Sequence, residues 1–91
     1  TILTISMQMI AAHAKHPTLA TTEYLRIIGH RHDLRKVGQE MYFPFQNALL
    51  ETLENFHGSD WSAELADAWK RAIETAVACM REGYVKGALP Y

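Results

Sequence analysis

Apolar residues recur at intervals of three and four positions along almost the whole chain, and this spacing restricts the fold more than any other feature. Such a period places side chains on one face of an α-helix, whereas a half-buried strand alternates at every second position. Proline and glycine interrupt the pattern at few places, notably Pro17, Gly38 and Gly58. The sequence therefore predicts an all-α domain of four helices with short connections.

The interruptions also suggest where each helix begins and ends. Hydroxyl side chains at the expected starts can accept hydrogen bonds from the free amides of a first turn. We predict a first helix over 2–15 and a short second helix that begins at Thr21 or Thr22. A third helix should run from about Met41 to just before Gly58. A fourth should begin after a cap at Ser62 or Asp60 and end at about Tyr84. The buried face of the third helix is predicted to carry Tyr42, Phe45, Leu49, Leu53 and Phe56.

Charge and composition exclude several classes of protein. Nine Lys and Arg stand against ten Asp and Glu, which argues against a nucleic-acid-binding surface, and no apolar run is long enough to span a membrane. The single cysteine forms no internal disulfide and fits a cytoplasmic location. Hydrophobic residues make up 48% of only 91 residues. A chain this short buries only a modest fraction of its surface when it folds alone, so we expect a cofactor, a partner chain or a further part of the protein to cover some of the apolar residues.

A histidine is the last residue on the apolar face of the predicted second helix. Leu25, Ile28 and His32 lie at i, i+3 and i+7 and share one side of the second helix. A neutral imidazole on such a face needs a partner for both nitrogens, and one of them can donate to a carbonyl about one turn earlier, near Ile28. The other nitrogen then presents a lone pair to apolar space, as a haem-iron ligand requires. A core histidine paired with protein or water is the alternative interpretation.

The remaining polar residues indicate no catalytic site. His13 and His16 are predicted to be solvated surface histidines, and Cys79 to be partly buried and inert. No Ser–His–Asp or Cys–His arrangement follows from the spacing. The aromatic residues are typical of a helical core, although some of them could stack on a flat cofactor.

An ordered set of these residues resembles the globin family. The segment from Leu25 to His32, followed by Val37, Tyr42 and Phe45, is similar to the F helix, FG corner and G helix of globins. Gly58, Trp69 and the Gly83–Tyr84 pair resemble the GH corner and the H helix. The similarity is to neuroglobin-like and related non-vertebrate or bacterial globins. It implies a single partial globin domain over 1–91, containing helices E to H and lacking helices A to D.

The resemblance implies that haem b is the cofactor and that His32 is the proximal ligand of its iron. Apolar contacts to the haem would come from both sides of the pocket. The residues that match haem-contacting positions of globins are Leu25, Ile28, Val37, Tyr42, Phe45, Leu49, Ile5 and Met9. The usual distal histidine or glutamine falls on Thr1 or just before the chain.

Three functions are compatible with this resemblance. The first is reversible binding of dioxygen or another diatomic gas for storage, transport or sensing. The second is a haem redox enzyme, such as a nitric oxide dioxygenase or a weak peroxidase, although nothing in the sequence specifies catalysis. The third is a haem-free helical interaction module. The apolar faces that helices A and B would cover predict a homodimer, either with or without exchange of helices between the two chains.

Overall fold

The protein is built from helices alone over the part that the structure describes. The computed structural model describes residues 2–86, with side chains from residue 5 to residue 85, and no strand occurs among them. The elements are α1 (Ile2–Lys15), α2 (Leu19–Leu34), η1 (Gln39–Met41), α3 (Tyr42–His57), η2 (Gly58–Asp60) and α4 (Ala63–Lys86). The predicted all-α architecture is confirmed. No helix within residues 2–86 combines the length and the apolar character needed to cross a membrane.

The helix boundaries match the sequence prediction at some ends and differ at others. The predicted bounds of α1 are confirmed, whereas α2 begins at Leu19, earlier than expected, and is 16 residues long rather than short. The cause is a capping box, in which Thr18 Oγ1 accepts from the Thr21 amide at 3.1 Å and the Thr18 amide donates to Thr21 Oγ1 at 3.0 Å. Thr21 therefore lies inside the helix. At the start of α4, Ser62 caps the helix as predicted, because its Oγ accepts from the Leu65 amide.

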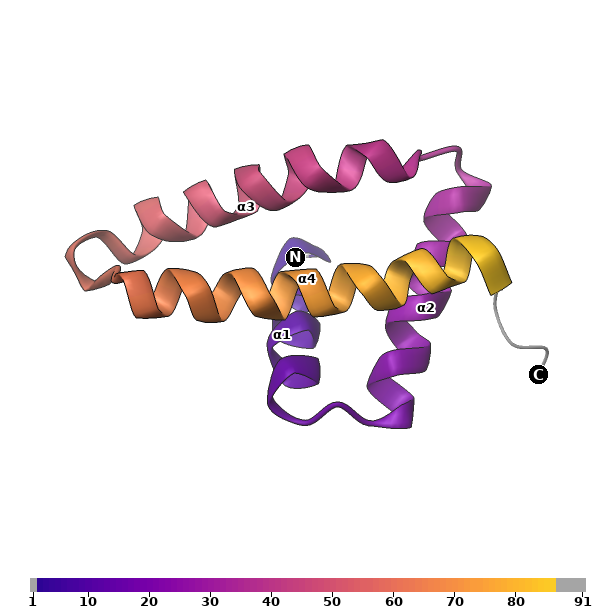
Figure 1. Ribbon diagram of the computed structural model, residues 1–91, viewed down its shortest axis with the longest axis horizontal. Helices are drawn as coiled ribbons and strands as arrows, with labels where there is room; N and C mark the ends of the chain where they lie inside the picture. Colours follow the sequence, from indigo (N-terminus) through magenta and orange to yellow (C-terminus); the bar gives the residue numbers. More distant parts are fainter. Residues whose placement is uncertain (1, 87–91) are drawn as a thin grey trace.

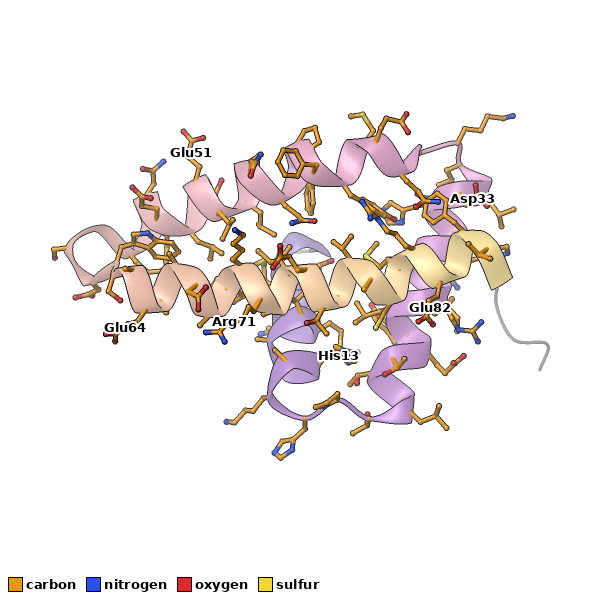
Figure 2. All side chains as sticks on the ribbon, in the orientation of Figure 1. His13, Asp33, Glu51, Glu64, Arg71 and Glu82 are labelled. Carbon is orange, nitrogen blue, oxygen red and sulfur yellow. The ribbon has the colours of Figure 1, made fainter. Side chains whose placement is uncertain are left out.

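The long helix α4 organises the other three. In Figure 1, α3 runs along α4 for much of its length, whereas α1 and α2 cross α4 at a steep angle. The helix α2 packs most extensively against α4, and α1 also contacts both α2 and α4. Charged side chains such as Glu51, Glu64 and Arg71 are exposed on the outside of this arrangement (Figure 2).

Two glycines bring the backbones of α2 and α4 into direct contact. A Cβ atom placed on Gly29 would lie 1.9 Å from the carbonyl oxygen of Met80, and one placed on Gly83 would lie 2.1 Å from that of Arg26. Both distances are far inside van der Waals contact, so only glycine fits at either position. The crossing point lies one turn before His32 on α2, and it therefore fixes where that part of the helix can lie.

The core lies where α1, α2 and α3 meet α4, and α4 contributes half of its fully buried apolar side chains. The buried apolar residues are Ile10, Leu25, Tyr42, Leu49, Ala72, Ile73, Ala76 and Val77. The prediction for the third helix was wrong at two positions, because Phe45 is 51% exposed and Phe56 is 82% exposed. Periodicity identifies the apolar face of a helix, but α4 covers only part of the face that α3 presents.

Candidate functional site

His32 makes the backbone contact that its position in the sequence predicts. Its Nδ1 atom lies 2.7 Å from the carbonyl oxygen of Ile28, one turn earlier on α2. A carbonyl oxygen only accepts hydrogen bonds, so Nδ1 carries the proton and the neutral ring presents a lone pair at Nε2. No side chain or backbone group among the described residues hydrogen-bonds to Nε2. The imidazole is therefore fixed in the tautomer and orientation of a metal ligand.

The ring of His32 lines an apolar cavity of about 360 Å³. That volume lies within the usual range for cofactor and ligand pockets. The helices α1, α2, α3 and α4 all contribute to the walls. Seven of the nine residues predicted for the site come together here: Ile5, Met9, Leu25, Ile28, His32, Phe45 and Leu49. The remaining lining residues are Ser6, Met7, Ile10, Tyr24 and Met80.

Sequence reasoning missed these five lining residues for different reasons. Met80 belongs to the predicted apolar stripe of α4, but periodicity does not show that it reaches the cavity. Tyr24 directly precedes Leu25, and the residue is 37% exposed. Ser6, Met7 and Ile10 lie beside the predicted α1 positions, so a wider helical face would have included them.

Tyr42 and Val37 do not line this cavity, although both were predicted site residues. Tyr42 instead lies between two other rings, with its ring centroid 6.4 Å from that of His32 and 5.8 Å from that of Tyr84. Burial, and then the neighbouring Tyr84, raise the pKa of Tyr42, so its phenol stays neutral. The carbonyl oxygen of Val37 accepts a hydrogen bond from the Tyr84 hydroxyl at 2.5 Å. The end of α4 is thereby joined to the corner that follows His32.

The usual distal position lies outside the residues that the structure describes, because it falls on Thr1. Within residues 5–85, His32 is the only histidine that lines the cavity. The walls that α1 provides carry mainly methionine and isoleucine side chains, with one hydroxyl from Ser6. This side of the cavity is therefore predominantly apolar.

His13 contradicts the prediction of a solvated surface histidine, because it is only 3% exposed. Its Nδ1 atom lies 2.9 Å from Thr21 Oγ1, and its Nε2 atom lies 3.6 Å from Cys79 Sγ. His16, three residues later, is exposed as predicted. The sequence offered one signal, because the apolar residue Ile10 lies one turn before His13 and therefore on the same edge of α1. The structure buries Ile10 as well.

Comparison with known proteins identifies the family of the chain. Residues 1–80 match the Globin family, and no solved structure matches the chain. The chain therefore belongs to the globin family, whose members typically bind haem.

The residues around the cavity fit a haem group on structural grounds. A flat, largely apolar macrocycle requires apolar walls, and its iron requires a nitrogen lone pair directed into the space. The cavity provides the first through residues such as Leu25, Ile28 and Leu49. His32 lines the cavity, and its Nε2 lone pair is available for the second because the hydrogen bond to the Ile28 carbonyl occupies the other ring nitrogen.

Proposed function

We propose that this globin is cytoplasmic, binds haem b through His32, and reversibly binds dioxygen or another diatomic gas for storage, transport or sensing. The observation that carries the proposal is the hydrogen bond from His32 Nδ1 to the Ile28 carbonyl, which leaves the Nε2 atom of this cavity-lining residue without a protein partner among the described residues. The bound iron would supply the coordination position for the gas. The protein would hold the iron, exclude water and orient the imidazole.

The His32→Ala variant tests this proposal directly. We expect the wild-type chain to take up hemin with a sharp Soret band, and the reduced form to shift that band when carbon monoxide is added. The variant should lose this spectrum and bind hemin at least about tenfold more weakly, because it lacks the axial ligand. Added imidazole should restore part of the spectrum in the variant.

His30→Ala is the matched control, because His30 lies on the same helix but does not line the cavity. An unchanged Soret band in His32→Ala would refute ligation by His32. A cooperatively folding wild-type chain that takes up no hemin would instead favour a haem-free interaction module. Sustained turnover with nitric oxide or peroxide, well above that of free hemin, would favour a redox enzyme.

We also propose that the chain forms a homodimer. Several large apolar side chains are exposed, including Leu19, Leu34, Phe43 and Phe56, each at 68% or more. Exposed apolar groups of this kind are commonly covered by a partner. Light scattering at micromolar concentration should give twice the chain mass of 10.3 kDa. Phe56→Ser and Phe43→Ser should shift the mass towards that of one chain, and a wild-type mass of 10.3 kDa would contradict the proposal.

A further inference from the structure

Methionine side chains are concentrated around the cavity that contains His32. The sequence has four methionines, and three of them, Met7, Met9 and Met80, line this cavity. The first two lie on α1 and the third lies on α4, so two helices that cross bring them together (Figure 1). The fourth, Met41, lies on η1 and does not line the cavity. Apolar contact with a bound group uses only the bulk of these side chains and leaves the chemistry of their sulfur atoms unassigned.

The three cavity methionines can be reached from solvent. Met7, Met9 and Met80 are each half-buried, neither enclosed in the core nor fully exposed. The cavity wall also includes Ile5 and Phe45, which are 54% and 51% exposed, so the cavity opens to the surface of the chain. A small oxidant such as hydrogen peroxide can therefore reach these thioethers while the protein stays folded.

We propose that Met7, Met9 and Met80 form a modification site for hydrogen peroxide, and that their oxidation weakens the binding of an apolar group in the cavity. In each reaction the thioether sulfur attacks one peroxide oxygen, the O–O bond breaks, an S–O bond forms and water is released. The sulfur is oxidised and the peroxide is reduced, so no other reactant is needed. The product is methionine sulfoxide, which is polar where the thioether is apolar. The inference rests on the proposed function for the identity of the bound group, haem.

The new sulfoxide oxygens find few hydrogen-bond donors in the cavity. Enclosing such an acceptor without a donor is unfavourable. The ring of His32 provides none, because its proton is already donated to the Ile28 carbonyl and Nε2 carries a lone pair. Ser6 and Tyr24 are the other lining residues with a donor on the side chain, and both are exposed. Oxidation therefore replaces apolar contacts with poorly paired polar groups and lowers the affinity for a flat apolar macrocycle.

Oxidation also affects the chain when no cofactor is bound. Met7 and Met80 pack against the buried core cluster as well as lining the cavity. A polar oxygen on either side chain lies at the boundary between the cavity and the core. The free energy of unfolding of the hemin-free chain should therefore fall on oxidation, and this readout does not depend on haem binding.

Peroxide treatment of the complete 91-residue, hemin-free chain, followed by catalase to remove the excess, tests the site. Peptide mapping by mass spectrometry identifies which methionines have gained an oxygen atom. We expect Met7, Met9 and Met80 to be oxidised while the chain stays folded. The hemin affinity, from titration of the Soret absorbance, should then fall at least about tenfold. Treatment with methionine sulfoxide reductases should restore it.

The variant that combines Met7→Leu, Met9→Leu and Met80→Leu is the matched control. Leucine keeps a similar apolar volume and forms no sulfoxide. The hemin affinity of this variant should be the same before and after peroxide treatment. The variant retains Cys79, so any effect of thiol oxidation would appear in it. Met41→Leu, which changes the methionine outside the cavity, should respond to peroxide as the wild-type chain does.

Several outcomes would overturn the inference. The first is an unchanged hemin affinity of the wild-type chain after Met7, Met9 and Met80 have been oxidised, and the second is an equal loss of affinity in the leucine variant. The third is a failure of the three to react under conditions that convert Met41 completely. An untreated wild-type chain that takes up no hemin would instead refute the proposed function. The denaturation midpoint of the hemin-free chain then decides, and a midpoint unaltered by oxidation would overturn the inference as well.

Discussion

Replacing Gly29 with alanine is expected to destabilise the protein by more than about 3 kcal/mol, at or beyond the upper end of ordinary overpacking effects. The new Cβ would lie 1.9 Å from the Met80 carbonyl oxygen, and that atom belongs to the backbone of α4 and cannot rotate away. The two helices must separate to admit it. The higher helix propensity of alanine, worth about 1 kcal/mol, offsets only part of this cost. Chemical denaturation monitored by circular dichroism measures the change.

Gly83→Ala should behave in the same way, because its Cβ would lie 2.1 Å from the Arg26 carbonyl oxygen and 2.6 Å from the His30 amide nitrogen. Gly38→Ala is the matched control. Gly38 has an ordinary φ of −71°, and a Cβ there would meet only the flexible end of the Glu40 side chain. If Gly29→Ala and Gly38→Ala were equally stable, the close approach of α2 and α4 described above would be incorrect.

Filling the cavity beside His32 is expected to weaken hemin binding at least about tenfold, or about 1.4 kcal/mol. Ile28→Trp places a large ring on the α2 wall of the cavity, one turn before the proposed ligand. The main chain of residue 28 still accepts the His32 hydrogen bond, so the variant removes space without removing the ligand. Titration with hemin, followed by its Soret absorbance, gives the affinity.

Ile27→Trp provides the comparison for this experiment. Ile27 is half-buried like Ile28 and adjacent to it, but it does not line the cavity. The Ile27→Trp variant should therefore bind hemin with nearly the wild-type affinity, even if its free energy of unfolding changes. Equal affinities for the two tryptophan variants would mean that hemin does not occupy this cavity.

The sequence predicts the local geometry of His32 well, because that geometry depends on one helix alone. The spacing of Leu25, Ile28 and His32 defines a face, and a helical backbone places the Ile28 carbonyl within reach of the imidazole. The predicted hydrogen bond is present for that reason. The geometry of one helix does not show what binds Nε2, so ligation of a haem iron by His32 is a proposal.

The errors in the sequence prediction concern contacts between helices. Periodicity did not show that α4 leaves Phe45 and Phe56 exposed, because exposure depends on which helices pack against α3. Burial of His13 depends on Thr21 and Cys79, which lie 8 and 66 positions away in sequence. The early start of α2 is a different case, since Thr18 and Thr21 are local and the reciprocal pair could have been recognised.

The contact at Gly29 and Gly83 has a consequence for how the pocket can change during evolution. The main chains of α2 and α4 touch there, so main-chain atoms fix the position of α2, and with it that of His32, relative to α4. Side chains elsewhere on the cavity wall can therefore vary in size and polarity without shifting the imidazole. A larger residue at Gly29 or Gly83, in contrast, would push the two helices apart and move the imidazole with them.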